Sequence, residues 1–256
     1  MPSPLFVANW KMNMLRAQTE AFCRHFMEMY TPNKCAIDVG IAPAVTSFDA
    51  LKNAFGDSCP VLLGVQNVHW LDSGAHTGEL SADMVKEMGA SFAIIGHSER
   101  RQFYGETDRT VSLRAKAAIT HGLTAIVCVG ELLDQFQAKQ TDTVVTAQLE
   151  GSLDGIANSD LTRLVIAYEP VWAIGTGLAA TPEIAENVHK LIRNWLCEKF
   201  GNQAGASVQI LYGGSTKPEN IAELMACPNI NGALVGGASL KPDVFWQLIA
   251  NGRPLC

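Results

Sequence analysis

The sequence predicts an α/β fold of one domain, a (β/α)8 barrel that spans residues 1–256. Short apolar, β-branched runs recur along the chain, and longer stretches with helical spacing lie between them. Eight such units follow one another, which is the number that closes a parallel sheet into a barrel. No linker rich in Pro or Ser and no shift in composition interrupts the alternation, so we predict a single domain.

The eight predicted strands are short and apolar. They are Leu5 to Ala8, Ile37 to Ala42, Val61 to Val65, Phe92 to Ile95, Thr124 to Val129, Leu164 to Ala167, Gln209 to Leu211 and Ala233 to Val235. Asn9-Trp10-Lys11 follows the first strand without a glycine. A dinucleotide-binding sheet carries its glycine-rich turn at this point, so the sequence argues against that fold.

The clearest predicted helices are Arg16 to Met29, Asp108 to Thr120 and Pro182 to Phe200. The last of them has signals at both ends. Thr181 is a good N-cap, Pro182 suits the first turn, and Gly201 ends the helix.

Composition and charge narrow the class of function. A hydrophobic share of 48% with 17% charged residues is typical of a globular protein with a large core. A formal net charge of -6 argues against nucleic acid or an acidic membrane surface as partner and favours a small molecule. The apolar stretch near the N-terminus is too short for a signal peptide, and no run reaches roughly 18 apolar residues. We therefore expect a cytoplasmic location and no membrane contact.

Metal and cofactor chemistry are not indicated. The seven cysteines are irregularly spaced and contain no CxxC pair. None of the six histidines pairs with a carboxylate at the spacing of metal ligands. We predict no metal and no cofactor.

Candidate site residues gather after the carboxyl ends of the predicted strands, which form the active face of a barrel. In chain order they are Asn9 and Lys11 after the first strand, His97 and Glu99 after the fourth, Glu169 after the sixth, Gly213, Gly214 and Ser215 after the seventh, and Gly236 and Gly237 after the eighth.

Glu169 stands at the end of a strand that Pro170 stops. Alone it could be a surface carboxylate. The following loop, Val171 to Gly177, is apolar and aromatic, whereas a passive connection is usually polar. We interpret it as a lid that closes over a ligand, buries Trp172 and Ile174, and brings the Gly175 N–H to an anion. Closure is expected to desolvate Glu169 and raise its pKa toward that of a general base.

The glycines after strands seven and eight could each form only a tight turn. Together they lie where many barrels bind phosphate through backbone N–H groups, and Ser215 adds a hydroxyl. His97 begins a helical turn, where the helix N-terminus favours a neutral ring that can polarise a carbonyl. Lys11 could pair with Glu99, stabilise an enediolate oxyanion, or do both.

Taken in order, eight motifs resemble the triosephosphate isomerase family over essentially the whole chain. They are Ala8 to Asn13 (ANWKMN), Gln66-Asn67, Gly78-Glu79, Gly96 to Arg101 (GHSERR), Cys128 to Glu131 (CVGE), Ala167 to Gly177 (AYEPVWAIGTG), Tyr212 to Ser215 (YGGS) and Gly232 to Gly237 (GALVGG). The run that contains the lid is the most specific.

The resemblance implies a TIM barrel that interconverts dihydroxyacetone phosphate and D-glyceraldehyde 3-phosphate without a cofactor. By the family's division of labour, Glu169 is the base and neutral His97 the hydrogen-bond donor to the enediol. The remaining implied roles are Asn9 and Lys11 at the oxyanion, Glu99 orienting Lys11, and Gly175, Ser215, Gly236 and Gly237 at the phosphate.

The resemblance also implies a homodimer in which the loop Val68 to Glu79 enters the partner's active site, with Thr77 near Asn9 and Lys11. His76 stands in this loop where the family usually has Phe or Tyr, so we expect acid to weaken the dimer. Met14 replaces a usual Gly and Leu178 a usual Lys. Neither touches a predicted catalytic role, although Leu178 lies at the lid's hinge and so bears on opening.

Three alternatives remain at this point. A Schiff-base aldolase would use Lys11 as nucleophile, yet Glu99 and Glu169 favour the charged ammonium. A metal-dependent sugar isomerase lacks a ligand set in the sequence. A non-catalytic barrel would have no reason to keep Asn9, Lys11, His97 and Glu169 together.

Overall fold

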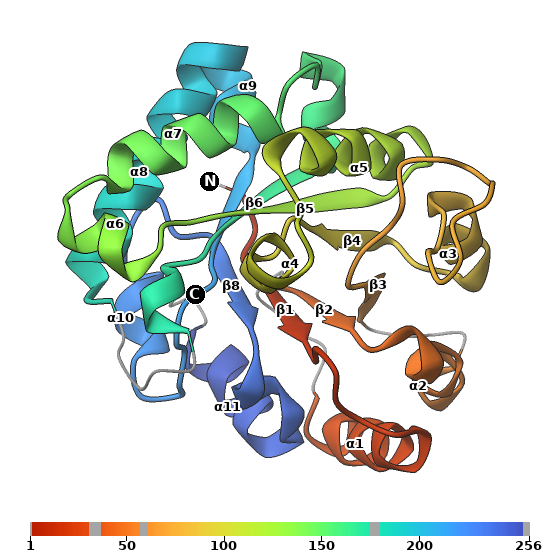
Figure 1. Cartoon of the computed structure of the whole chain (residues 1–256). Coiled ribbons are helices and arrows are strands. Elements are labelled where there is room, and N and C mark those ends of the chain that lie inside the picture. The colour runs from red at the N-terminus through yellow and green to blue at the C-terminus, as the bar shows by residue number, and fades with distance from the viewer. Residues whose placement is uncertain (1, 31–36, 57–60, 175–179, 253–256) are drawn as a thin grey trace.

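A computed structural model of the chain describes residues 2–30, 37–56, 61–174 and 180–252. Eight parallel strands form a closed barrel in which each strand pairs with its neighbours in chain order and β1 closes on β8 (Figure 1). The strands are β1 (Leu5–Asn9), β2 (Asp38–Ala42), β3 (Leu62–Val65), β4 (Phe92–Ile95), β5 (Thr124–Val129), β6 (Leu164–Tyr168), β7 (Gln209–Tyr212) and β8 (Gly232–Val235). The predicted (β/α)8 TIM barrel is confirmed.

The helices surround the barrel (Figure 1). They are α1 (Arg16–Met29), α2 (Phe48–Phe55), α3 (Ala82–Met88), α4 (Ser98–Phe103), α5 (Asp108–Thr120), α6 (Leu133–Gln137), α7 (Thr141–Ser152), α8 (Pro182–Phe200), α9 (Asn202–Ser207), α10 (Ile221–Met225) and α11 (Pro242–Asn251). Short 3-10 turns are η1 (Val45–Ser47), η2 (Asn158–Arg163), η3 (Val171–Ala173) and η4 (Gly237–Leu240). The three helices predicted from the sequence have the expected bounds.

Helix α8 shows how sequence signals fix a helix. The Thr181 hydroxyl accepts a hydrogen bond from the Ile184 N–H at 3.3 Å, and Pro182 occupies the first turn. The helix buries one stripe, made of Ala185, Val188, His189, Ile192, Leu196 and Phe200. Gly201 follows with φ 91°, which favours glycine. The stripe places the polar His189 inside the layer between helices and barrel.

Apolar side chains fill the inside of the barrel, so a ligand can reach it only at its ends. Leu5 and Val7 of β1 join an interior cluster with Phe92, whereas Phe6 and Ala8 pack between strands and helices. A Cβ at Gly64 would lie 2.3 Å from the Phe92 ring, so the glycine makes room for this ring. A filled interior leaves the loops after the strands as the place for chemistry.

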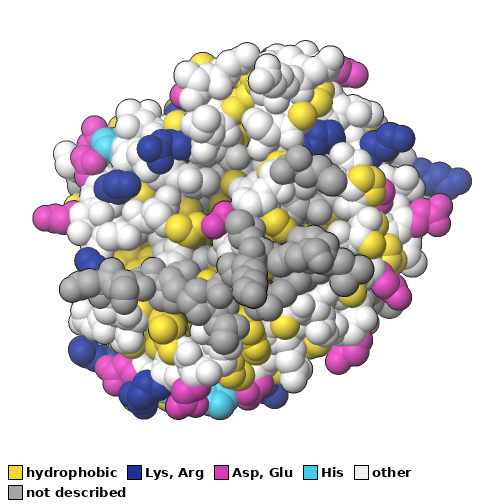
Figure 2. Space-filling model, turned by 180° about the vertical axis from the view of Figure 1, so that it is seen from behind, with side chains coloured by type: hydrophobic (Ala, Val, Ile, Leu, Met, Phe, Trp, Pro, Cys, Tyr) yellow, Lys and Arg dark blue, Asp and Glu magenta, His cyan; other side chains and the backbone are white. Residues whose placement is uncertain are grey.

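The described part of the chain contains no helix long and apolar enough to cross a membrane. Figure 2 shows the face behind that of Figure 1, where basic and acidic side chains alternate around the rim. The described residues of this face form no continuous basic area in that view.

Candidate active site

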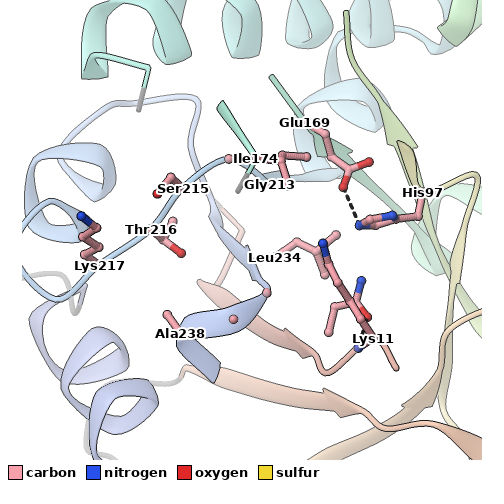
Figure 3. A pocket seen from close by; sticks show the side chains of 14 residues that line it. Lys11, His97, Glu169, Ile174, Gly213, Ser215, Thr216, Lys217, Leu234 and Ala238 are labelled. Atoms are coloured by element: carbon pink, nitrogen blue, oxygen red, sulfur yellow. Dashed lines mark hydrogen bonds and ion pairs between the residues drawn. The ribbon is translucent and has the colours of Figure 1, made fainter. Parts of the chain in front are cut away.

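The predicted site residues meet in one pocket of about 310 Å³ at the carboxyl ends of the strands (Figure 3). Asn9, Lys11, His97 and Glu169 line it together with Ser215, Gly236 and Gly237. Gly213, Gly214 and Ile174 also line it, as do Thr216 and Lys217, which the sequence analysis did not single out. Glu99 lies beside this pocket and contacts Lys11. The predicted anion contact of Gly175 and the departure at Leu178 lie outside the described residues.

Glu169 is fixed by bonds on both carboxylate oxygens. Its side chain is 3% exposed, and its backbone N–H donates to the Val129 carbonyl at 2.8 Å at the end of β6. Its Oε1 lies 2.9 Å from His97 Nε2, and its Oε2 accepts a hydrogen bond from the Ser98 N–H at 2.9 Å. The carboxylate is therefore buried, and both of its oxygens are satisfied by the protein itself.

His97 is the N-cap of α4, and its position determines which ring nitrogen carries the proton. Its Nδ1 accepts a hydrogen bond from the Glu99 N–H at 3.2 Å. The proton of the neutral ring must then sit on Nε2, which points at Glu169. The predicted neutral tautomer agrees with this geometry.

The pKa of Glu169 is shifted in the direction opposite to the one predicted. Burial by itself raises the pKa of Glu169, but the charge and hydrogen bond of His97 outweigh it and lower the pKa below its ordinary value. Burial likewise lowers the pKa of His97, and the Glu169 carboxylate reverses that effect, so the pKa is raised. The prediction of a raised pKa for Glu169 is wrong for this arrangement, because it took no account of the 2.9 Å contact.

Lys11 is held in an unusual backbone conformation. Its φ is 52°, in the left-handed region that non-glycine residues seldom adopt. The Asn9 side-chain oxygen accepts from the Lys11 N–H at 3.1 Å, and Gln66 Nε2 donates to the Lys11 carbonyl at 2.9 Å. The ammonium lies 2.6 Å from Glu99 Oε1. The predicted association of Asn9, Lys11 and Glu99 is present, and local strain of this kind is typical of functional sites.

The first half of the lid is anchored through buried polar groups. Trp172 stacks on Phe136 with ring centroids 4.3 Å apart, and its Nε1–H donates to Glu131 at 2.8 Å. The Tyr168 hydroxyl donates to the same carboxylate at 3.1 Å. The predicted burial of Trp172 is confirmed, whereas Ile174 is only half-buried and lines the pocket.

The glycines of the site differ in what surrounds them. A Cβ at Gly213 would lie 2.8 Å from Glu169 Cγ, and one at Gly214 would lie 2.3 Å from the Tyr212 hydroxyl. At Gly237 a Cβ would meet nothing within 4 Å. The first two glycines therefore permit close packing, and Gly237 leaves its backbone open to the pocket.

Comparison with known proteins gives one family. The family model described as triosephosphate isomerase matches residues 4–252. The triosephosphate isomerase of Geobacter metallireducens is 45% identical over 249 residues, which cover 97% of this chain and 98% of that protein. The triosephosphate isomerases of Chlorobium phaeovibrioides and Solibacter usitatus are also 45% identical over 97% of this chain. The matches cover 98% of the first protein and 99% of the second.

Proposed function

The chain belongs to the triosephosphate isomerase family and interconverts dihydroxyacetone phosphate and D-glyceraldehyde 3-phosphate, and we propose that Glu169 is the base that moves the proton. The observation that carries this proposal is the placement of the buried Glu169–His97 pair in one pocket with Lys11 and the glycines after β8. The pocket offers a base, a neutral donor, a cation and an anion-binding backbone.

The reaction needs one proton to move between adjacent carbons while the carbonyl changes place. Glu169 removes the proton from the carbon next to the carbonyl, and the negative charge develops on the carbonyl oxygen. His97 Nε2–H donates to that oxygen, and the Lys11 ammonium with Asn9 stabilises the charge. The hydroxyl proton on the neighbouring carbon has to pass to the former carbonyl oxygen, and His97 can relay it by giving its Nε2 proton to one oxygen and taking a proton from the other. Glu169 then returns its proton to the neighbouring carbon, whose oxygen becomes the new carbonyl. No electron leaves or enters the substrate, so the chemistry needs no redox cofactor.

Substrate binding has to separate Glu169 from His97, because each occupies the bonding position of the other. Once they part, their mutual attraction weakens and burial becomes the main influence on both groups. Burial raises the pKa of Glu169 and lowers that of His97. The base is thereby strengthened and the donor kept neutral when the substrate is in place.

The phosphate of the substrate belongs at the other end of the pocket. Gly236 and Gly237 supply backbone N–H groups there, and Ser215 supplies a hydroxyl. The family resemblance assigns Gly175, which lies outside the described residues, to the same set. This division leaves Glu169 and His97 to the reacting carbons.

We propose a homodimer through the loop of residues 68–79. Residues 71–79 are all exposed. Large apolar side chains are exposed elsewhere as well, among them Met12, Leu15 and Tyr104 in connecting segments and Phe103 at the end of α4. A hollow of about 180 Å³ lies beside Lys11 and Glu99, and among its lining residues Asn67 has a buried Oδ1 without a hydrogen bond. Thr77 of a partner subunit has a hydroxyl that suits such an acceptor.

We also propose one domain over residues 1–256 and a cytoplasmic location. Barrel elements run from Leu5 to Asn251, and the two apolar clusters of the described residues lie on the two faces of the same closed sheet. Cys128, Cys197 and Cys227 are free thiols, as is usual in a reducing compartment.

The Schiff-base alternative is disfavoured by the contact of Lys11 with Glu99 at 2.6 Å. This ion pair favours the ammonium, which cannot attack a carbonyl. Borohydride should therefore fail to trap dihydroxyacetone phosphate on Lys11, and a trapped adduct would restore the aldolase.

A coupled assay with glyceraldehyde 3-phosphate tests the proposal, with Glu169→Asp as the variant. Retracting the carboxylate by about 1 Å should lower turnover on the order of 100-fold with little change in the affinity for inorganic phosphate. A wild-type protein without isomerase activity would favour the non-catalytic barrel. A Glu169→Asp variant with full activity would place the base elsewhere.

A further inference from the structure

Asn220 connects helix α10 to the loop at the phosphate end of the pocket. It is half-buried and directly precedes α10. Its Oδ1 accepts a hydrogen bond from the Lys217 N–H at 2.8 Å, and its Nδ2 donates to the Ser215 carbonyl at 3.2 Å. One side chain therefore fastens both ends of residues 215–217.

The helix explains only one of these two bonds. The N–H groups of Asn220 and Ile221 both donate to the Lys217 carbonyl at 3.2 Å, so the turn that leads into α10 begins at Lys217. A side chain three residues after such a first residue commonly accepts from its N–H, and a carboxylate can do this as well as an amide. The bond from Nδ2 to the Ser215 carbonyl requires an amide. Asn at residue 220 therefore serves more than the end of the helix.

The bond to the Ser215 carbonyl fixes the orientation of the Ser215–Thr216 peptide. A trans peptide is planar, so its C=O and N–H point in opposite directions. The carbonyl points at Asn220, which does not line the pocket, and the Thr216 N–H points away from it.

The Thr216 N–H is in a position to bind an anion. Thr216 is 6% exposed and lines the pocket, and Figure 3 shows it beside Ser215 on the wall across from His97. Its N–H donates to none of the residues that the structure describes. A buried N–H without an acceptor is costly, and a phosphate oxygen in the pocket would satisfy it.

We propose that Asn220 is a positioning residue for the phosphate, because its amide holds the Ser215–Thr216 peptide with the Thr216 N–H turned toward the anion. This inference rests on the proposed function and adds one N–H to the groups that bind the phosphate. Asn220 acts only through the loop, since it does not line the pocket itself. Its loss weakens the grip on the phosphate and leaves proton transfer at Glu169 unchanged.

Asn220→Asp gives the sharpest test, because it removes the donor and keeps the acceptor. The carboxylate can still accept from the Lys217 N–H, so the melting temperature should be preserved. The Ser215 carbonyl loses its donor, and the peptide is then free to turn. KM for glyceraldehyde 3-phosphate and the inhibition constant of inorganic phosphate should both rise roughly fivefold, with kcat within about twofold.

Asn251→Asp is the matched control for the added charge and the lost donor. Asn251 Nδ2 donates to the Pro218 carbonyl at 2.8 Å, in the same loop but outside the pocket. This variant should match the wild type in KM and in phosphate inhibition. Asn220→Ala adds no charge and should show the loss seen in Asn220→Asp. Equal behaviour of Asn220→Asp and Asn251→Asp would overturn the inference, and so would an Asn220→Ala variant with wild-type constants.

Two further readouts separate phosphate binding from other effects. Turnover of unphosphorylated D-glyceraldehyde should be the same in Asn220→Asp and the wild type, and an equal loss with this substrate would contradict the proposed role. If the wild type isomerises and Asn220→Asp binds phosphate as tightly, only this inference fails. If the wild type does not isomerise, the proposed function fails, and calorimetric titration with inorganic phosphate still decides whether Asn220 supports anion binding.

Discussion

The two ends of the pocket are built from different materials. At the proton-transfer end, Glu169 and His97 are buried and bonded to each other, and Lys11 is paired with Glu99. At the phosphate end, Gly236 and Gly237 present backbone, and Ser215 lies beside them. A proton that must move between fixed atoms needs side chains held in place, whereas an anion that must only be held is served by N–H groups and open space.

The largest expected effect concerns His97, at the proton-transfer end of the pocket. His97→Gln keeps a hydrogen-bond donor but removes the ring, and we expect kcat to fall on the order of 10³-fold. The pKa of Glu169 should rise, because the charge and hydrogen bond of His97 are what lower it against burial. Catalysis needs the ionised carboxylate, so the acid limb of the residual kcat/KM profile, which reports the free enzyme, should move to higher pH. A profile that stays in place would show that His97 does not control Glu169.

Gly213→Ala and Gly237→Ala compare the two ends directly. The new methyl at residue 213 would lie 2.8 Å from Glu169 Cγ, so we expect kcat to fall on the order of 100-fold with a loss of about 1–3 kcal/mol in unfolding free energy. At residue 237 nothing lies within 4 Å. Stability there should change by less than about 0.5 kcal/mol while KM for the triose phosphate rises roughly tenfold. Similar kinetics and stability in both variants would remove the distinction.

His189 is a buried residue of α8, outside both ends of the pocket. The pH dependence of stability tests its protonation state. Its ring packs against Tyr168 and Tyr212, with centroids 5.7 Å and 6.3 Å apart. Burial lowers the pKa of His189 from 6.5 to about 4, so the unfolded chain binds its proton first on acidification. This contribution to stability is present above pH 6.5 and is lost as the pH falls toward 4.

The wild type should therefore lose about 2 kcal/mol more than His189→Gln between pH 6.5 and 4.5, measured by urea unfolding. Parallel curves for the two proteins would mean that His189 is not held neutral in the core.

The smallest expected effect concerns His25, a residue outside the pocket, and it serves as a reference for the variants in the pocket. His25 on α1 contacts Asp243 of α11 at 2.8 Å, and this hydrogen bond and charge, with a smaller contribution from Glu28, raise its pKa. The contribution is present below about pH 6.5 and disappears as the pH rises through the folded-state pKa. The melting temperature of His25→Gln should fall slightly below that of the wild type at pH 6 and match it at pH 8.5. Catalysis should not change at either pH.

Much of this architecture could be predicted from local signals. The caps of α8 fixed its bounds, and the apolar runs located all eight strands. Strands β6 and β7 extend one residue further than predicted, to Tyr168 and Tyr212, because these aromatic residues continue the buried pairing of the barrel.

Two features of the site were not predicted from the sequence, for different reasons. The pKa shifts of Glu169 and His97 arise from a contact between two segments that are far apart in the chain. Lys217 and Thr216 were missed because the recognised motif stops at Ser215, although their polar character after β7 was a usable signal. Met14 adopts φ 71°, so the residue that replaces a usual glycine keeps the backbone conformation that glycine favours.

The most direct test of the central claim is the isomerisation of dihydroxyacetone phosphate by Glu169→Gln, measured beside its affinity for inorganic phosphate. Gln has the shape of Glu and can still accept from the Ser98 N–H, but it cannot take a proton from carbon. We predict a rate at least about 10³-fold below that of the wild type, with phosphate binding no weaker than before. A variant that isomerises within about tenfold of the wild type would contradict the assignment of Glu169 as the base.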